Sequence, residues 1–119
     1  MILIDKATII NEGETFTGSL LLEGERISRV FRGEVPEQQL QSCRKRIDAR
    51  GLILIPGVID DQVHFREPGL THKGDLFTES RAAVAGGVTS YMEMPNTQPQ
   101  TITNDALRQK QELAAGRSA

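Results

Sequence analysis

The feature that most constrains the fold is a change of hydrophobic pattern at Pro56-Gly57. Before this point, short runs of β-forming residues are separated by turns. After it, apolar runs alternate with stretches of helical periodicity. Two successive strand–helix units require parallel strands joined by right-handed crossovers. We therefore predict an α/β protein with a β-rich segment, residues 1–57, followed by two βα units in residues 58–119.

The first segment contains a hairpin signal, because Glu23-Gly24-Glu25 separates β-forming runs at residues 18–22 and 26–31. A short loop with a glycine between two such runs is typical of a hairpin. Residues 2–4 and 7–10 add further β character. We expect a small β-sandwich layer without catalytic groups of its own.

Residues 33–39 are polar, contain a proline and are expected to form a loop.

The second segment is predicted to contain parallel strands at residues 58–65 and 88–94. Between them, Asp75 can accept a hydrogen bond from the first turn of a helix, and Gly86-Gly87 can end that helix.

A second helix is expected to begin after Thr103 and to end near Gly116. A closed (β/α)8 barrel takes about 250 residues, whereas this chain has 119. We therefore expect the N-terminal part of a larger barrel, completed by residues beyond Ala119 or by another chain.

Composition excludes several classes of function. The net charge of -2 gives no electrostatic reason to expect nucleic acid or an anionic membrane as a partner. No apolar run reaches the about 18 residues of a transmembrane helix, and the first residues do not resemble a signal peptide. The single cysteine, Cys43, cannot form an internal disulfide and is expected to be inert. We expect a cytoplasmic location.

Polar side chains gather where the two strands end. Gln62 and His64 close the first strand, Arg66 follows it, and Asn96 follows the second strand. In α/β barrels the active site lies at these carboxyl ends. An imidazole is a common zinc ligand, and a guanidinium fork fits a carboxylate. The pattern predicts a site for a metal and an anion.

Strict alternation along the first strand places its side chains on two opposite faces. The polar set is Asp60, Gln62 and His64, and the apolar set is Ile59, Val63 and Phe65. Gln62 and His64 would then lie about 6.6 Å apart on one face. Asp61 falls on the apolar face, where its carboxylate has no evident partner.

Each polar residue also has a structural interpretation. His64 can be a hydrogen-bonded structural residue, Arg66 a surface salt-bridge residue, and Asn96 a turn residue after proline. His72 has no partner at useful spacing and is expected to be exposed.

Four segments together resemble, in order and spacing, the N-terminal third of the dihydroorotases, which are cyclic amidohydrolases. These segments are residues 54–60, 63–69, 81–89 and 94–99. The combination of Arg66-Glu67-Pro68-Gly69 with Met94-Pro95-Asn96-Thr97 is specific, because the related hydantoinases and allantoinases lack it.

The resemblance implies a metallo-dependent (β/α)8 hydrolase with one or two zinc ions. Its reaction would be the reversible hydrolysis of L-dihydroorotate to N-carbamoyl-L-aspartate in pyrimidine biosynthesis. His64 matches a metal ligand, Arg66 and Asn96 match residues that hold the substrate carboxylate, and Asp60 matches a residue behind the ligands. The catalytic residues would lie beyond Ala119, and the resemblance implies a homo-oligomer.

Gln62 departs from the family motif Asp-x-His-x-His, in which the first histidine would occupy this position. An amide oxygen is a weaker zinc ligand than an imidazole. The protein can therefore be an enzyme with one zinc, with another metal, or with Gln62 as a distant ligand. It can also be a non-catalytic partner of aspartate carbamoyltransferase, or an allantoinase. Arg66 and Asn96 favour an enzyme, because a scaffold needs no carboxylate clamp.

Overall fold

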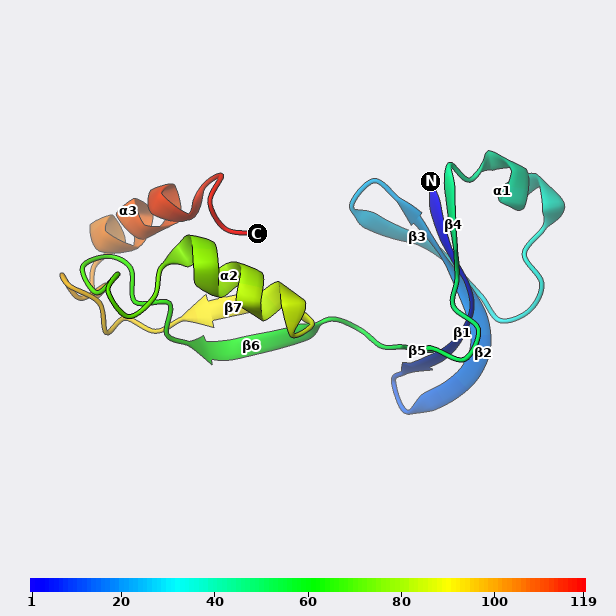
Figure 1. Ribbon diagram of the computed structural model, residues 1–119, viewed down its shortest axis with the longest axis horizontal. Helices are drawn as coiled ribbons and strands as arrows, with labels where there is room; N and C mark the ends of the chain where they lie inside the picture. The colour runs from blue at the N-terminus through cyan, green and yellow to red at the C-terminus, as the bar shows by residue number, and fades with distance from the viewer. The chain divides into compact units, whose positions relative to one another are not determined.

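The computed structural model describes residues 1–119 and divides into two compact units, Met1–Pro56 and Gly57–Ala119. We call them the N-terminal unit and the C-terminal unit. Figure 1 labels their helices and strands.

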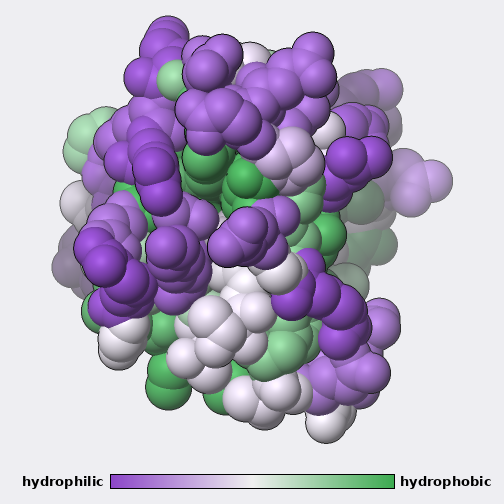
Figure 2. All heavy atoms as spheres, turned by 90° about the vertical axis from the view of Figure 1, so that its right-hand side faces the viewer, coloured by the Kyte–Doolittle hydropathy of each residue, from purple (hydrophilic) through white to green (hydrophobic).

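The N-terminal unit is a five-stranded sheet with one short helix. Its elements are β1 (Ile2–Asn11), β2 (Glu14–Glu23), β3 (Arg26–Phe31), α1 (Glu37–Ser42), β4 (Lys45–Asp48) and β5 (Ile53–Leu54). The strand order is β3-β2-β1-β4, and β5 also pairs with β1. The strands β1, β2 and β3 are antiparallel neighbours, which confirms the predicted hairpin, whereas β4 and β5 run parallel to β1. Figure 2 shows one face of this unit, where hydrophilic side chains predominate and hydrophobic ones lie between them.

A bulge interrupts β1, and it explains why the sequence showed two separate β runs. The pairing register with β2 shifts by one residue between Ile4 and Ala7, and Lys6 has a φ of 61°. One extra residue in a strand reverses which side chains face each side. Leu3 therefore packs with Leu21 and Phe31, whereas Ala7 belongs to a different buried cluster.

Residues 33–36 form the expected loop, but helix α1 begins at Glu37, so the expectation of a loop was wrong for residues 37–39. The helix has no side-chain cap and only six residues, so its sequence carries little helical signal. Leu40 packs against the cluster of Leu3, Leu21 and Phe31. Tertiary packing thus stabilises a helix that local signals do not predict.

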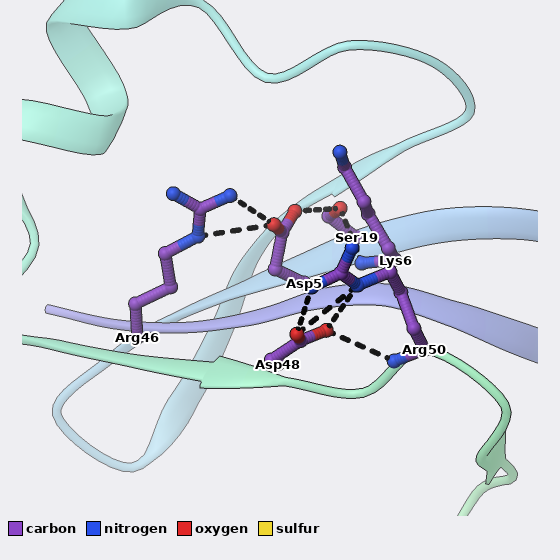
Figure 3. Close-up of polar contacts among 6 residues, drawn as sticks. All are labelled: Asp5, Lys6, Ser19, Arg46, Asp48 and Arg50. Carbon is purple, nitrogen blue, oxygen red and sulfur yellow. Dashed lines mark hydrogen bonds and ion pairs between the residues drawn. The ribbon is translucent and has the colours of Figure 1, made fainter.

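A polar cluster surrounds the bulge (Figure 3). The Asp5 carboxylate is buried and accepts hydrogen bonds from Ser19 Oγ at 2.7 Å and from Arg46 Nε at 3.0 Å. The backbone N–H of Lys6 donates to the same Ser19 Oγ at 3.1 Å. Burial raises the pKa of Asp5, but the hydrogen bonds from Arg46 and Ser19 outweigh it and lower the pKa overall. These bonds link β1, β2 and β4 at the point where the register shifts.

Asp48 and Arg50 complete this cluster, beside a hollow of about 460 Å³. Hydrogen bonds from the side chain and backbone N–H of Arg50 lower the pKa of Asp48 to about 2. Both carboxylates of the cluster thus accept hydrogen bonds from guanidinium groups.

The C-terminal unit is a β-α-β-α arrangement with a parallel pair of strands, as predicted. Its elements are β6 (Val58–Val63), α2 (Leu76–Ala85), β7 (Val88–Glu93) and α3 (Asn104–Ala114). Both helices pack on one face of the strand pair (Figure 1), around a core of Val63, Phe65 and Leu76. No helix of the protein is long and apolar enough to cross a membrane.

The predicted helix ends are confirmed. Asp75 Oδ1 accepts a hydrogen bond from the Thr78 backbone N–H at 2.8 Å, and Thr103 Oγ1 accepts one from the Ala106 N–H at 3.2 Å. Gly86 is the C-cap of α2. Gly116 has a φ of 71° just after the last turn of α3, the left-handed conformation that ends many helices.

A bulge also interrupts β6, and it corrects the expected faces of this strand. Asp60 pairs with Tyr91 and Val63 with Glu93, so one extra residue lies in β6 between the two pairs. Asp60 therefore shares the helix-facing side with Val63 rather than with Gln62 and His64. Strict alternation fails at a bulge because the extra residue has no opposite partner.

The same bulge accounts for two further side chains of β6. Ile59 is 68% exposed instead of packing with Val63 and Phe65, so that expectation was wrong. Asp61 is exposed, which removes the problem of an unpaired carboxylate on an apolar face.

Candidate active site

The loops that follow β6 and β7 lie at the same edge of the sheet, because the two strands are parallel. His64 in the first loop and Asn96 in the second are brought together, with Nδ1 of His64 3.0 Å from Oδ1 of Asn96. An amide oxygen only accepts hydrogen bonds, so Nδ1 carries the proton. The lone pair of Nε2 is then available to a ligand or a metal.

Arg66 lies in the first loop with a φ of 70°, and its side chain is half-buried. None of the ion pairs in the structure includes Arg66. The structural alternative for Arg66, a surface salt bridge, is therefore not supported, because no carboxylate pairs with it. Its guanidinium remains available to an external anion.

The two loops are hydrogen-bonded to each other. The Gln98 N–H donates to the Pro68 carbonyl at 3.0 Å, and the Met94 N–H donates to the Val63 carbonyl at 2.9 Å. Gly69 has a φ of 84°, and a Cβ at this position would collide with the Gln98 carbonyl. These contacts fix the loop of Arg66 against the loop of Asn96.

Glu67 is a functional candidate that the sequence did not single out, because it stands there only as one member of the Arg66-Glu67-Pro68-Gly69 motif. Its side chain is buried, with Oε2 accepting from the Leu76 N–H at 3.0 Å and Oε1 accepting from Arg117 Nη1 at 2.6 Å. Burial raises the pKa of Glu67, but the hydrogen bonds from Arg117 and Leu76 outweigh it and lower the pKa overall. The sequence signal that could have indicated Glu67 is a charged residue directly before the Pro68-Gly69 turn.

A second buried pair supports the Asn96 loop and was also missed. Lys110 of α3 places Nζ 2.7 Å from Oε2 of Glu93, and both side chains are less than a tenth exposed. This contact is an ion pair without the geometry of a directed hydrogen bond, and Oε1 has no hydrogen-bond partner. Nζ also donates to the Met94 carbonyl at 3.2 Å. Lys110 thus ties α3 to the end of β7.

The remaining predicted residues lie on β6. The Gln62 side chain is exposed, and its backbone N–H donates to Asp60 Oδ1 at 3.0 Å. This short-range bond occupies the Asp60 carboxylate within the bulge. Asp60 is half-buried on the helix-facing side. His72, expected to be exposed, is exposed.

The side chains near the strand ends fit a metal ion only in part. No group of three or more histidine, cysteine, aspartate or glutamate side chains is placed to hold one. His64 fits a zinc ligand through Nε2, and Gln62 can add a neutral oxygen. Zinc takes four ligands as a rule, so His64 and Gln62 alone do not make a complete zinc site.

Comparison with protein-family profiles finds no match, but curated proteins provide clear relatives. The chain is 49% identical over 82 residues to the dihydroorotase of Wolbachia sp. subsp. Drosophila simulans (strain wRi), covering 69% of this chain and 18% of that protein. It is 52% identical over 73 residues to the dihydroorotase of Pelobacter propionicus, covering 61% of this chain and 17% of that protein. The chain is related to the dihydroorotases. It spans about a fifth of the length of these dihydroorotase relatives.

Solved structures extend this relationship to other cyclic amidohydrolases. An L-hydantoinase from Arthrobacter aurescens matches with a TM-score of 0.83 at 26% identity, over 95% of this chain and 24% of that one. A D-hydantoinase from Bacillus sp. AR9 matches with a TM-score of 0.78 at 28% identity, over 99% of this chain and 25% of that one. The dihydroorotases are thus the relatives by sequence, and the mixed α/β fold is that of the N-terminal region of hydantoinases.

Proposed function

We propose that the full-length protein is a dihydroorotase, which catalyses the reversible hydrolysis of L-dihydroorotate to N-carbamoyl-L-aspartate. The observation that carries this proposal is the 49% identity to a dihydroorotase. The pairing of His64 with Asn96 across the two strand-end loops supports it. The chain spans 18% of that relative, so the proposal concerns the whole protein.

The C-terminal unit is proposed to be the start of a (β/α)8 barrel, and the N-terminal unit part of a β-sandwich that precedes it. The parallel β6–β7 pair with both helices on one face supports the barrel, because a barrel keeps its helices outside. The other face of the pair exposes Ile59 and Met92, at 68% and 61%, and would line the interior.

Arg66 and Asn96 are proposed to hold the substrate carboxylate. The planar guanidinium of Arg66 offers two parallel N–H donors to a carboxylate. The Oδ1 atom of Asn96 is engaged by His64, which leaves its NH₂ group free to donate to the same carboxylate. One asparagine can thus orient both an imidazole and a substrate.

His64 is proposed to bind zinc through Nε2, with Asp60 fixing the backbone of the same strand. When bound, zinc polarises an amide carbonyl and lowers the pKa of a coordinated water. The hydrogen bond to Asn96 sets the tautomer of His64 and the orientation of its ring. By the same relationship we propose a cytoplasmic homo-oligomer that acts in pyrimidine biosynthesis.

A second candidate is a non-catalytic partner of aspartate carbamoyltransferase, and Gln62 is the observation that favours it. Loss of one imidazole weakens metal binding, and a scaffold does not need the metal. The unpaired Arg66 favours the enzyme instead, because a half-buried guanidinium without a carboxylate is suited to receive one.

The test is an assay of the purified full-length protein, with and without added zinc, on dihydroorotate, hydantoin and allantoin. Turnover of dihydroorotate above the other two rings supports the proposal. Turnover of hydantoin or allantoin alone would assign a related amidohydrolase. Absence of turnover with every divalent metal, together with binding to aspartate carbamoyltransferase, would establish the scaffold.

A further inference from the structure

The backbone of Arg66 is held in a conformation that a side chain disfavours. Its φ is 70°, and only two other residues that are not glycine, Lys6 and Glu12, have a positive φ. Lys6 lies in the β1 bulge and Glu12 in a hairpin turn, where positive φ has a local cause. Such a conformation persists only when the surroundings impose it.

The next residue, Glu67, makes the contacts that hold this loop against the helices. One carboxylate oxygen accepts from Leu76, the first residue of α2, and the other accepts from Arg117, which follows α3. The carbonyl of Arg117 in turn accepts from Arg81 Nη1 of α2 at 3.1 Å. Glu67 therefore connects the Arg66 loop to the start of one helix and the end of the other.

Backbone hydrogen bonds also hold the residues on either side of Glu67. The Leu70 N–H donates to the Arg66 carbonyl at 3.0 Å, and the Gln98 N–H of the Asn96 loop donates to the Pro68 carbonyl. The carbonyl of Arg66 and the two residues that follow it are thus restrained, while the Arg66 side chain makes no ion pair. A restrained backbone with a free guanidinium is the arrangement expected of a preorganised anion contact.

We propose that the ion pair between Glu67 and Arg117 positions Arg66 to receive the substrate carboxylate. This inference rests on the proposed function for the identity of the substrate. Glu67 and Arg117 are positioning residues, because neither is expected to touch the substrate. Breaking the pair leaves the Arg66 side chain intact but allows its backbone to leave the left-handed conformation.

The main variant is Arg117→Met in the full-length protein, since Arg117 is the more exposed partner of the pair, with 40% of its side chain exposed against 10% for Glu67. We expect the KM for dihydroorotate to rise by about 10- to 100-fold with kcat nearly unchanged, the scale of a small misplacement of a binding group. Arg117→Lys should recover part of the loss. The matched control is Arg108→Met, which removes an exposed arginine of α3 paired with Asp105 and should leave KM unchanged.

A double-mutant cycle with Arg66→Met separates positioning from a general structural effect. If the pair acts through Arg66, Arg117→Met has no further effect on KM once the Arg66 guanidinium is gone. An equal rise of KM in both backgrounds, or an unchanged KM in folded Arg117→Met, would overturn the inference.

A readout without turnover keeps the inference testable if the proposed function is wrong. Amide hydrogen exchange at Leu70 and Leu76 should accelerate in Arg117→Met and not in Arg108→Met, because the loop loses its anchor. If exchange accelerates in Arg117→Met as expected but the wild type does not turn over dihydroorotate, the proposed function is refuted and the anchor stands. Exchange unchanged by Arg117→Met would overturn the anchor itself.

Discussion

Arg66 combines a disfavoured backbone conformation with a guanidinium that no carboxylate of the chain engages. At the scale of single residues, this is the property that supports the proposal that Arg66 binds an anion. In the loop after β7, Asn96 is likewise held by one atom, Oδ1, with its NH₂ group left free. The two donors belong to different loops, so a carboxylate between them would be recognised by both.

We expect Arg66→Lys in the full-length protein to raise the KM for dihydroorotate by about tenfold, because a point charge cannot replace the planar fork. Steady-state kinetics measures this effect. Arg108→Lys, on the exposed side of α3, is the matched control and should behave as wild type. Equal KM values for wild type and Arg66→Lys would remove Arg66 from the substrate site.

Gln62→His is expected to raise the zinc content of the purified full-length protein, since an imidazole replaces a weak oxygen donor beside His64. Gln38→His adds a histidine to exposed α1 and controls for nonspecific binding. Metal analysis of the three proteins decides the question. Two tightly held zinc ions in the wild type would show that Gln62 does not weaken zinc binding.

At the scale of elements, bulges and buried ion pairs decide how the strands and helices meet. At the β1 bulge, Asp5 and the Lys6 N–H are hydrogen-bonded to Ser19, and Asp5 also accepts from Arg46. At the β6 bulge, the Asp60 carboxylate accepts a hydrogen bond from the Gln62 N–H. Each bulge moves side chains between faces. The β6 bulge in particular exposes Ile59 and places Asp60 toward the helices.

We expect Asp5→Asn to destabilise the protein by about 1–3 kcal/mol, because a buried acceptor of charged hydrogen bonds becomes a neutral amide. Denaturant unfolding measures the difference. Asp105→Asn breaks an exposed pair, with side chains 66% and 76% exposed, and should cost less than about 1 kcal/mol. Equal effects of the two substitutions would show that the buried cluster contributes no more than a surface pair.

The Glu67 anchor has a predicted pH dependence. The pKa of Glu67 is lowered from its ordinary value of 4.5 in the folded protein. A lowered folded pKa means that the charged form stabilises the fold at pH above 4.5, and this contribution is lost as pH falls through the folded pKa.

Arg117→Met removes the strongest opposing hydrogen bond, so burial should raise the pKa of Glu67 and the loss should begin at higher pH. Amide exchange at Leu76, measured at decreasing pH, reports the loosening. Arg108→Met should follow the wild-type profile. Identical profiles for Arg117→Met and wild type would contradict the prediction.

At the scale of the whole molecule, the C-terminal unit leaves large apolar side chains exposed. One face of its strand pair exposes Ile59 and Met92, and α2 exposes Phe77 at 47%. Two parallel strands rarely form a stable sheet unless both faces are covered. Large exposed apolar areas favour association.

We therefore expect the isolated 119-residue segment to aggregate or to unfold without a cooperative transition. Thermal unfolding followed by circular dichroism, at several protein concentrations, tests this expectation. The full-length protein is the control and should unfold cooperatively. A cooperative, concentration-independent transition of a monomeric segment would contradict us.

Signals confined to a few neighbouring residues were readable from the sequence alone. Asp75 and Thr103 cap their helices because a side-chain oxygen reaches a backbone N–H three residues away. The Glu23-Gly24-Glu25 turn and the order β-α-β-α were read in the same way, since each depends on local pattern. The positions of His64, Arg66 and Asn96 after the two strands were readable in the same way.

Tertiary structure alone decided the bulges, helix α1 and the supporting ion pairs. A bulge is defined by pairing with another strand, and α1 forms because Leu40 packs on distant β residues. The Glu67–Arg117 contact joins residues 50 positions apart, which no local pattern connects. The sequence thus determined which groups stand at the strand ends, and long-range packing determined how they are held, because desolvation and cross-strand pairing exist only in the folded chain.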